Sequence, residues 1–152
     1  MLALFFLHSE FLNDRVISIV GYSLGTVIIM QMVKVLYKFY RQGYVKAGRI
    51  LHDIYLWAGA FVISYKKLEK DNHKRAQMCK IISGRLANNY CLKDYVLKYM
   101  FKQAIDADPI GIQKIFHNFE DYMEVKRAFN YENSTFCSGH MDYTEKAGLI
   151  LA

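Results

Sequence analysis

Short apolar runs alternate with amphipathic stretches along this chain. After a first helix over residues 2–12, residues 15–20 form a nearly continuous β-branched run, which is typical of a central parallel strand buried on both faces. The segment from residue 26 to Gly43 has helical periodicity, with apolar side chains around most of its circumference. Its polar face is formed by Gln31, Lys34, Lys38 and Arg41. We therefore expect a strand followed by a mostly buried helix that stops at Gly43.

Three further strands are predicted downstream. Residues 53–60 and 86–90 are short apolar runs, although two asparagines interrupt the second. A helix is expected over residues 95–105, and a last strand near residues 123–129 or at 129–131. Because strands alternate with helices, the sequence predicts an α/β fold with a mostly parallel sheet and helices on both faces.

The composition is that of one globular domain. The chain has 152 residues, of which 53% are hydrophobic and 22% charged, so a packed core is expected and a disordered chain is not. The net charge of +6 raises the question of nucleic acid or acidic lipid, but the basic residues are scattered in small clusters such as Lys66, Lys67 and Lys70. No apolar stretch approaches the roughly 20 residues of a membrane span. We expect no nucleic-acid partner and no membrane span within this chain.

Cysteine and histidine usage does not indicate a metal site or a disulfide framework. Cys79, Cys91 and Cys137 are odd in number and lack C-x-x-C spacing, which fits an intracellular, reducing compartment. Four histidines without metal-ligand spacing are interpreted as surface or satisfied core residues: His8, His52, His73 and His117. No metal or other cofactor is expected.

The sharpest chemical motif is Gly21-Tyr22-Ser23-Leu24-Gly25, a G-x-S-x-G pattern between the predicted strand and helix. In a nucleophile elbow the serine sits on a strained strand-to-helix turn, and small residues two positions before and after it let the two elements approach. The alternative is a glycine-rich turn with an incidental serine. The flanking strand and helix favour the elbow.

A serine hydroxyl needs a base to take its proton and a carboxylate to orient that base. Asp94 and His140 follow Ser23 in the order serine, acid, histidine, and both lie where strands are expected to end. From these residues alone, Asp94 is equally well explained as a helix N-cap, and His140 as an ordinary loop histidine. Three other acids suit the position less well: Asp106, Asp108 and Asp121.

Four ordered blocks resemble the α/β-hydrolase-like domain of the transmembrane and coiled-coil domain-containing proteins. They are residues 16–26 (VISIVGYSLGT), 54–60 (IYLWAGA), 83–97 (SGRLANNYCLKDYVL) and 138–143 (SGHMDY). The resemblance implies a catalytic triad of Ser23, Asp94 and His140 and membrane segments elsewhere in family members. Two stretches depart from the family pattern, Trp57-Ala58 and residues 119–133, which leaves the strand order near His140 open.

On this reading, residues 1–152 form a single partial α/β-hydrolase-like domain that lacks the N-terminal strands. Leu24 would supply one oxyanion-hole amide, and the loop that supplies the other would be missing. The predicted function is a serine hydrolase acting on an ester or thioester of an acyl or lipid substrate. The alternative is a non-catalytic, hydrolase-like subunit of a membrane-associated assembly, in which other protein chains cover the incomplete sheet. Charge alone supports a third reading, a binder of nucleic acid or acidic lipid.

Overall fold

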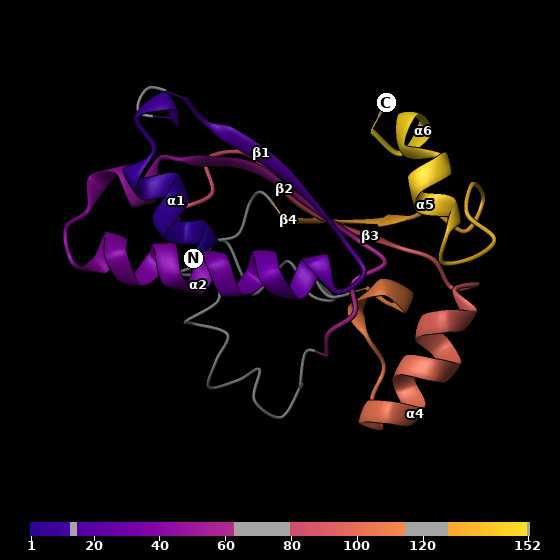
Figure 1. Ribbon diagram of the computed structural model, residues 1–152. Helices are drawn as coiled ribbons and strands as arrows, with labels where there is room; N and C mark the ends of the chain where they lie inside the picture. The colour runs from indigo at the N-terminus through magenta and orange to yellow at the C-terminus, as the bar shows by residue number, and fades with distance from the viewer. Residues whose placement is uncertain (13–14, 63–79, 115–127, 152) are drawn as a thin grey trace.

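A four-stranded parallel sheet forms the centre of the computed structural model, which describes residues 1–12, 15–62, 80–114 and 128–151 (Figure 1). The strands lie in the order β1-β2-β3-β4, and each is parallel to its neighbour. Their bounds are β1 (Ile17–Tyr22), β2 (Leu51–Trp57), β3 (Leu86–Tyr90) and β4 (Ala128–Glu132). The α/β class with a parallel sheet is therefore confirmed.

Helices lie on both sides of this sheet. In Figure 1, α1 (Leu2–His8) and α2 (Gly25–Arg41) lie below it, and α5 (Asp142–Glu145) and α6 (Ala147–Leu151) lie above its right-hand end. The remaining helical segments are η1 (Glu10–Leu12), η2 (Val45–Gly48), the π-helical η3 (Val96–Phe101), α4 (Lys102–Ile105) and η4 (Ile110–Ile112). No helix within the described ranges is long and apolar enough to cross a bilayer.

Most predicted elements occur close to their expected positions. β3 has the predicted bounds, the helix over residues 95–105 is formed by η3 and α4, and β4 matches the second of the two positions considered for the last strand. The first helix is divided into α1 and η1. The basic cluster of Lys66, Lys67 and Lys70 and the alternative strand residues 123–127 lie outside the described residues.

The prediction that the first strand is buried on both faces was wrong. Within the described sheet β1 is an edge strand, and Val16 just before it and Val20 within it are exposed. β-Branched residues favour extended backbone whether or not both faces are covered, so the apolar run correctly predicted the strand but not its place in the sheet.

The main core lies between α2 and the sheet. Ile29, Val33 and Leu36 recur at helical spacing on one face of α2 and are buried in the same cluster as Ile54 and Leu56 of β2. The four predicted polar positions of α2 are exposed, as expected, and the helix ends at Arg41 before Gly43, which has a left-handed φ of 94°. Two apolar residues that were expected to be buried are instead exposed, Ile28 and Val35.

Beyond the carboxyl end of the sheet, a second cluster packs around Tyr143 and includes Trp57, Cys91, Leu97 and Cys137. The two asparagines of β3 help to form this end of the molecule. The amide nitrogen of Asn88 donates to the carbonyls of Ile110 and Gln113, at 3.3 and 3.0 Å, and so holds η4 against β3. The Asn89 side chain accepts a hydrogen bond from Asn133 at 3.3 Å. Polar residues within a buried strand therefore position loops.

The turn from β1 to α2 is tight on one side only. A Cβ added at Gly21 would lie 2.6 Å from Cδ1 of Ile29 and 3.0 Å from Cα of Thr26, so the close approach of strand and helix requires glycine there. A Cβ added at Gly25 would meet no described atom within 4 Å. The expected need for a small residue is therefore confirmed at Gly21, but not at Gly25.

This asymmetry predicts different outcomes for two matched substitutions. Gly21→Ala should lower the free energy of unfolding by about 1–3 kcal/mol, because Ile29 and the first turn of α2 must shift. Gly25→Ala should leave it unchanged or raise it by up to about 1 kcal/mol, because alanine favours the helix that begins there. Urea unfolding of the two variants measures both values, and equal losses in the two would contradict the packing described for this turn.

Candidate active site

Ser23 occupies a strained position between β1 and α2. Its φ is 53°, in the left-handed region that non-glycine residues rarely adopt. Several hydrogen bonds hold it there: its N–H donates to the Trp57 carbonyl at 2.9 Å, and its own carbonyl accepts from the N–H and Oγ1 of Thr26 at 3.1 and 2.5 Å. The turn is fixed between β2 and α2, which leaves the side chain at the carboxyl end of the sheet.

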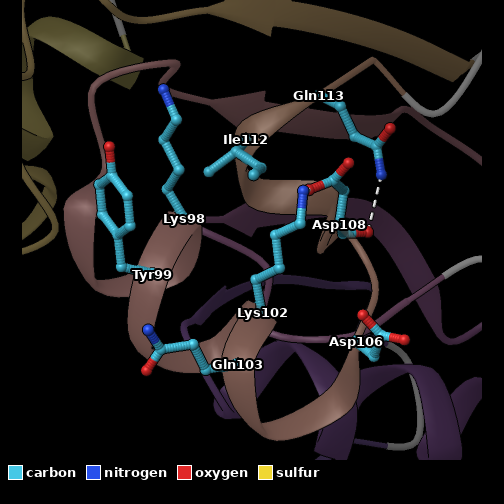
Figure 2. A pocket seen from close by; sticks show the side chains of 8 residues that line it. All are labelled: Lys98, Tyr99, Lys102, Gln103, Asp106, Asp108, Ile112 and Gln113. Carbon is cyan, nitrogen blue, oxygen red and sulfur yellow. Dashed lines mark hydrogen bonds and ion pairs between the residues drawn. The ribbon is translucent and has the colours of Figure 1, made fainter.

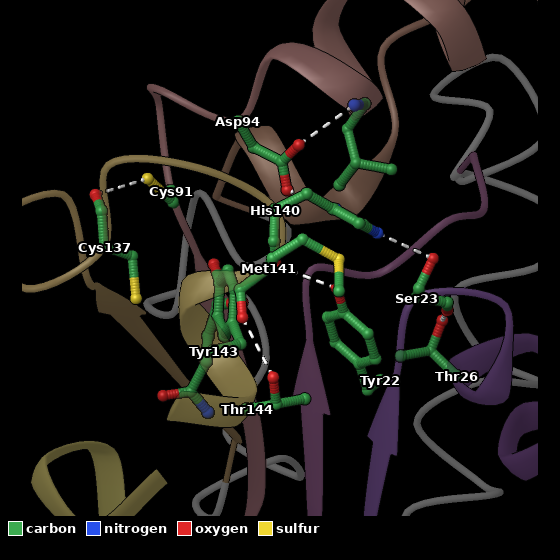
Figure 3. Close-up of polar contacts among 12 residues, drawn as sticks. Tyr22, Ser23, Thr26, Cys91, Asp94, Cys137, His140, Met141, Tyr143 and Thr144 are labelled. Carbon is green, nitrogen blue, oxygen red and sulfur yellow. Dashed lines mark hydrogen bonds and ion pairs between the residues drawn. The ribbon is translucent and has the colours of Figure 1, made fainter. Parts of the chain in front are cut away.

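The structure brings Ser23, His140 and Asp94 into one hydrogen-bonded line, shown in Figure 3. Nε2 of His140 lies 3.0 Å from Oγ of Ser23, and Nδ1 lies 2.7 Å from Oδ2 of Asp94. The Asp94 side chain is fully buried, and that of His140 is 9% exposed. If the Asp94 carboxylate accepts from Nδ1–H, then Nε2 of a neutral imidazole is left to accept the hydroxyl proton of Ser23.

Asp94 makes the two interactions that its sequence position suggested, one with each oxygen. Oδ1 accepts a hydrogen bond from the N–H of Leu97 at 3.0 Å, at the start of η3, while Oδ2 faces His140. The carboxylate is therefore fixed to its own helical turn as well as to the imidazole. A buried carboxylate requires such partners, because burying the charge without them is costly.

Tyr22 contacts both the backbone and the ring of His140. Its hydroxyl donates to the backbone carbonyl of His140 at 2.9 Å, and its ring lies 5.1 Å from the imidazole between centroids. Burial raises the pKa of Tyr22, and the nearby Asp94 carboxylate raises it further, so the hydroxyl stays protonated and remains a donor. Sequence reasoning did not single out Tyr22, although it is the residue just before the motif serine.

Local hydrogen bonds close the segment from Phe136 to Asp142 into a loop. Oδ2 of Asp142 accepts from both the N–H and the Oγ of Ser138, at 2.7 Å each, and these hydrogen bonds lower the pKa of Asp142. Lys146 donates to the Phe136 carbonyl. His140 lies within this closed loop, so its backbone position is set by contacts on both sides of it.

Tyr143 anchors the loop from within the core. It is fully buried, and its hydroxyl donates to the carbonyl of Asn89 in β3 at 3.2 Å. Burial strongly raises its pKa, so this hydroxyl also acts as a donor. Tyr143 was another residue missed from the sequence. Its place three positions after His140, with an apolar ring and a polar tip, is a weak signal for such an anchor.

The two described cysteines lie close to the site but do not compete as nucleophiles. Cys91 and Cys137 are buried, and Sγ of Cys91 donates to the Cys137 carbonyl at 3.0 Å. Burial, followed by the neighbouring Cys91, raises the pKa of Cys137 to about 11. Because the thiolate is the reactive form, Cys137 is inert near neutral pH.

Leu24 has a geometry that suits an amide donor. It precedes the first residue of α2, and its backbone N–H makes no hydrogen bond with any residue that the structure describes. The first N–H groups of a helix lack partners within the helix and are therefore free to bind an oxygen of a ligand.

The alternative acids lie elsewhere. Asp108 is exposed and pairs with Lys102 at 2.8 Å, and Asp106 ends α4 with a left-handed φ of 52°. Both line a cavity of about 610 Å³ beside α4, shown in Figure 2. Asp121 lies outside the described residues, as do His73 and His117. His8 and His52 are exposed, and His52 contacts Oγ of Ser83 at 3.0 Å.

Three relatives align with nearly all of this chain at low identity. The "Uncharacterized membrane protein F35D11.3" of Caenorhabditis elegans is 27% identical over 140 residues, which cover 91% of this chain and 20% of that protein. The "Uncharacterized membrane protein C6F6.13c" of Schizosaccharomyces pombe is 26% identical, with 93% of this chain and 16% of that protein covered. The "Probable lipase MIL1" of Saccharomyces cerevisiae is 26% identical, with 92% of this chain and 11% of that protein covered.

The chain therefore spans a fifth or less of the length of these relatives. No solved structure is significantly similar to it. The names of two relatives agree with the membrane-protein part of the resemblance that the sequence motifs suggested. A family model matches residues 2–152, and the chain belongs to that family, which is described as "Protein of unknown function (DUF726)".

Proposed function

We propose that this chain carries the site of a serine hydrolase that cleaves an ester or thioester, within an α/β-hydrolase-type domain. The observation that carries the proposal is the continuous line from Asp94 through His140 to Ser23, with distances of 2.7 and 3.0 Å. The order of these residues along the chain, and the strained turn between a parallel strand and a helix, are those of α/β-hydrolases.

In the proposed mechanism, Oγ of Ser23 attacks the carbonyl carbon of the substrate while Nε2 of His140 takes the hydroxyl proton. Asp94 holds the imidazole in the orientation that leaves Nε2 facing the serine and stabilises the imidazolium that forms. The same proton then passes to the departing alcohol or thiol. Water attacks the acyl-serine, with His140 again as the base, and releases the acid.

The Leu24 N–H is proposed to stabilise the oxyanion of the tetrahedral intermediate. It adjoins the nucleophile at the start of α2, as this role requires. A second donor is not assigned among the described residues. We propose that the second donor comes from a segment that pairs with the open edge of β1. Removal of one oxyanion-hole donor typically costs about 100- to 1,000-fold in rate.

The name of the yeast relative, a probable lipase, supports a lipid ester as the substrate class. The relatives named as membrane proteins support a location at or near a membrane.

A second candidate function is a non-catalytic, hydrolase-like subunit. It is favoured by β1, whose outer edge has no partner among the described residues and carries the exposed Val20. An unpaired edge invites association with another strand. On this reading the hydrogen-bonded line would serve only to stabilise the loops, and Ser23 would show no enhanced reactivity.

A fluorophosphonate probe separates the two candidates. We expect the wild-type chain to be labelled on Ser23, Ser23→Ala to be unlabelled, and His140→Ala to react at least about 100-fold more slowly, because the base is lost. Ser134→Ala, which removes another loop serine of the same end of the molecule, should be labelled like wild type. A folded wild-type chain that is not labelled would refute the hydrolase function and favour the non-catalytic subunit.

Asp94→Asn tests the orienting role with little change in shape. Asparagine retains an oxygen that accepts from the Leu97 N–H, so the fold should be preserved, but it no longer favours the imidazole orientation and charge that the reaction needs. We expect labelling to slow by about 100-fold or more. Asp108→Asn is the matched control, since Asp108 is exposed and pairs with Lys102 instead of His140, and equal rates for the two variants would refute the role of Asp94.

A further inference from the structure

Each residue of the proposed triad is followed directly by a large, exposed apolar side chain. Leu24 after Ser23 is 65% exposed, Tyr95 after Asp94 is 66% exposed, and Met141 after His140 is 65% exposed. Single exposed apolar residues are common on protein surfaces. These three come from separate segments whose preceding side chains are joined by hydrogen bonds, so they surround one site.

The helical segment after Asp94 enlarges this apolar surface. Tyr99 and Met100 on η3 are also exposed, and the rings of Tyr95 and Tyr99 stack with centroids 5.5 Å apart. We refer to Leu24, Tyr95, Tyr99, Met100 and Met141 as the apolar collar. A large exposed apolar patch around a site marks a surface for binding a partner or an apolar ligand.

In the segment that carries Tyr95, Tyr99 and Met100, the exposed charges are positive. Lys93 and Lys98 are exposed on either side of Tyr95, whereas the one acid between them, Asp94, is buried against His140. Nζ of Lys98 lies 5.9 Å from the Tyr99 ring centre, and in Figure 2 the two side chains extend side by side. Nζ of Lys93 donates to the backbone carbonyl of Ser134 at 3.0 Å. Neither lysine forms an ion pair with a described carboxylate.

We propose that the apolar collar docks on an anionic lipid surface, and that the substrate of Ser23 enters the site from that surface. Exposed tyrosines with apolar neighbours suit the boundary between headgroups and acyl chains, and lysines are attracted to anionic headgroups. A protein held permanently on the collar would cover Ser23, whereas a fluid lipid surface delivers an acyl ester to it. The statement about substrate entry rests on the proposed function, but the docking itself does not.

Vesicle cosedimentation tests the docking. The chain carrying Ser23→Ala, which cannot consume the lipid, is mixed with phosphatidylcholine vesicles that contain or lack phosphatidylserine. We expect binding that requires phosphatidylserine and weakens with added salt. Two double substitutions at the collar, Tyr95→Ser with Met100→Ser and Lys93→Glu with Lys98→Glu, should each weaken binding by about tenfold or more.

Two matched pairs of substitutions on α2 and η2 act as controls. Tyr44→Ser with Val45→Ser removes two other apolar side chains that are more than half exposed, and Lys34→Glu with Lys38→Glu makes the same change in net charge. Both should retain binding within about twofold to threefold, because the carboxyl half of α2 and the segment that follows it lie at the opposite end of the molecule from α4 (Figure 1). Absence of vesicle binding, equal losses in collar and control variants, or a collar-dependent dimer that does not bind vesicles would each overturn the proposal.

The docking and the proposed hydrolase fail in different experiments. Vesicle binding without fluorophosphonate labelling would support the docking and refute the proposed hydrolase activity. Labelling without vesicle binding would support the hydrolase activity and refute the docking.

Discussion

The hydrogen bond between the buried Asp94 carboxylate and Nδ1 of His140 is the contact on which the carboxyl end of this molecule depends. It joins residues 46 positions apart, one in the turn after β3 and one in the loop after β4. A carboxylate with no exposed surface must have its oxygens satisfied, and here the imidazole and the Leu97 N–H do so. Loss of the His140 imidazole would leave one buried carboxylate oxygen without its partner, at a cost of about 1–3 kcal/mol or more. The loop and the turn therefore stabilise each other.

The parallel sheet explains why this contact also reaches Ser23. Since all four strands run the same way, the residues that follow β1, β3 and β4 meet at one edge, although they are far apart in sequence. The left-handed backbone of Ser23 costs about 1–3 kcal/mol and persists because the Trp57 and Thr26 hydrogen bonds hold it. Tyr22 and Tyr143, each protonated and donating to a backbone carbonyl, then hold the His140 loop over that turn.

The sequence predicted features that depend on local chemistry better than those that depend on distant neighbours. The bounds of β3, the end of α2 before Gly43 and the requirement for glycine at position 21 follow from periodicity and backbone geometry. The edge position of β1 and the free space beside Gly25 depend on what lies across the sheet, which no local pattern records. Tyr22 and Tyr143 were missed because an aromatic residue beside a motif looks the same whether it fills space or positions a loop. The proximity of Ser23, Asp94 and His140 agrees with the motif order, while their catalytic role remains a proposal.

The proton NMR spectrum of the His140 imidazole in the folded chain tests the buried Asp94–His140 contact most directly. A hydrogen bond from Nδ1–H to a buried carboxylate shields that proton from exchange and deshields its nucleus. We therefore expect a resonance far downfield of the amide region that is absent in His140→Ala and in Asp94→Ala. A folded chain with no such resonance at low temperature, or one whose resonance persists in Asp94→Ala, would contradict the buried pair on which the proposed site depends.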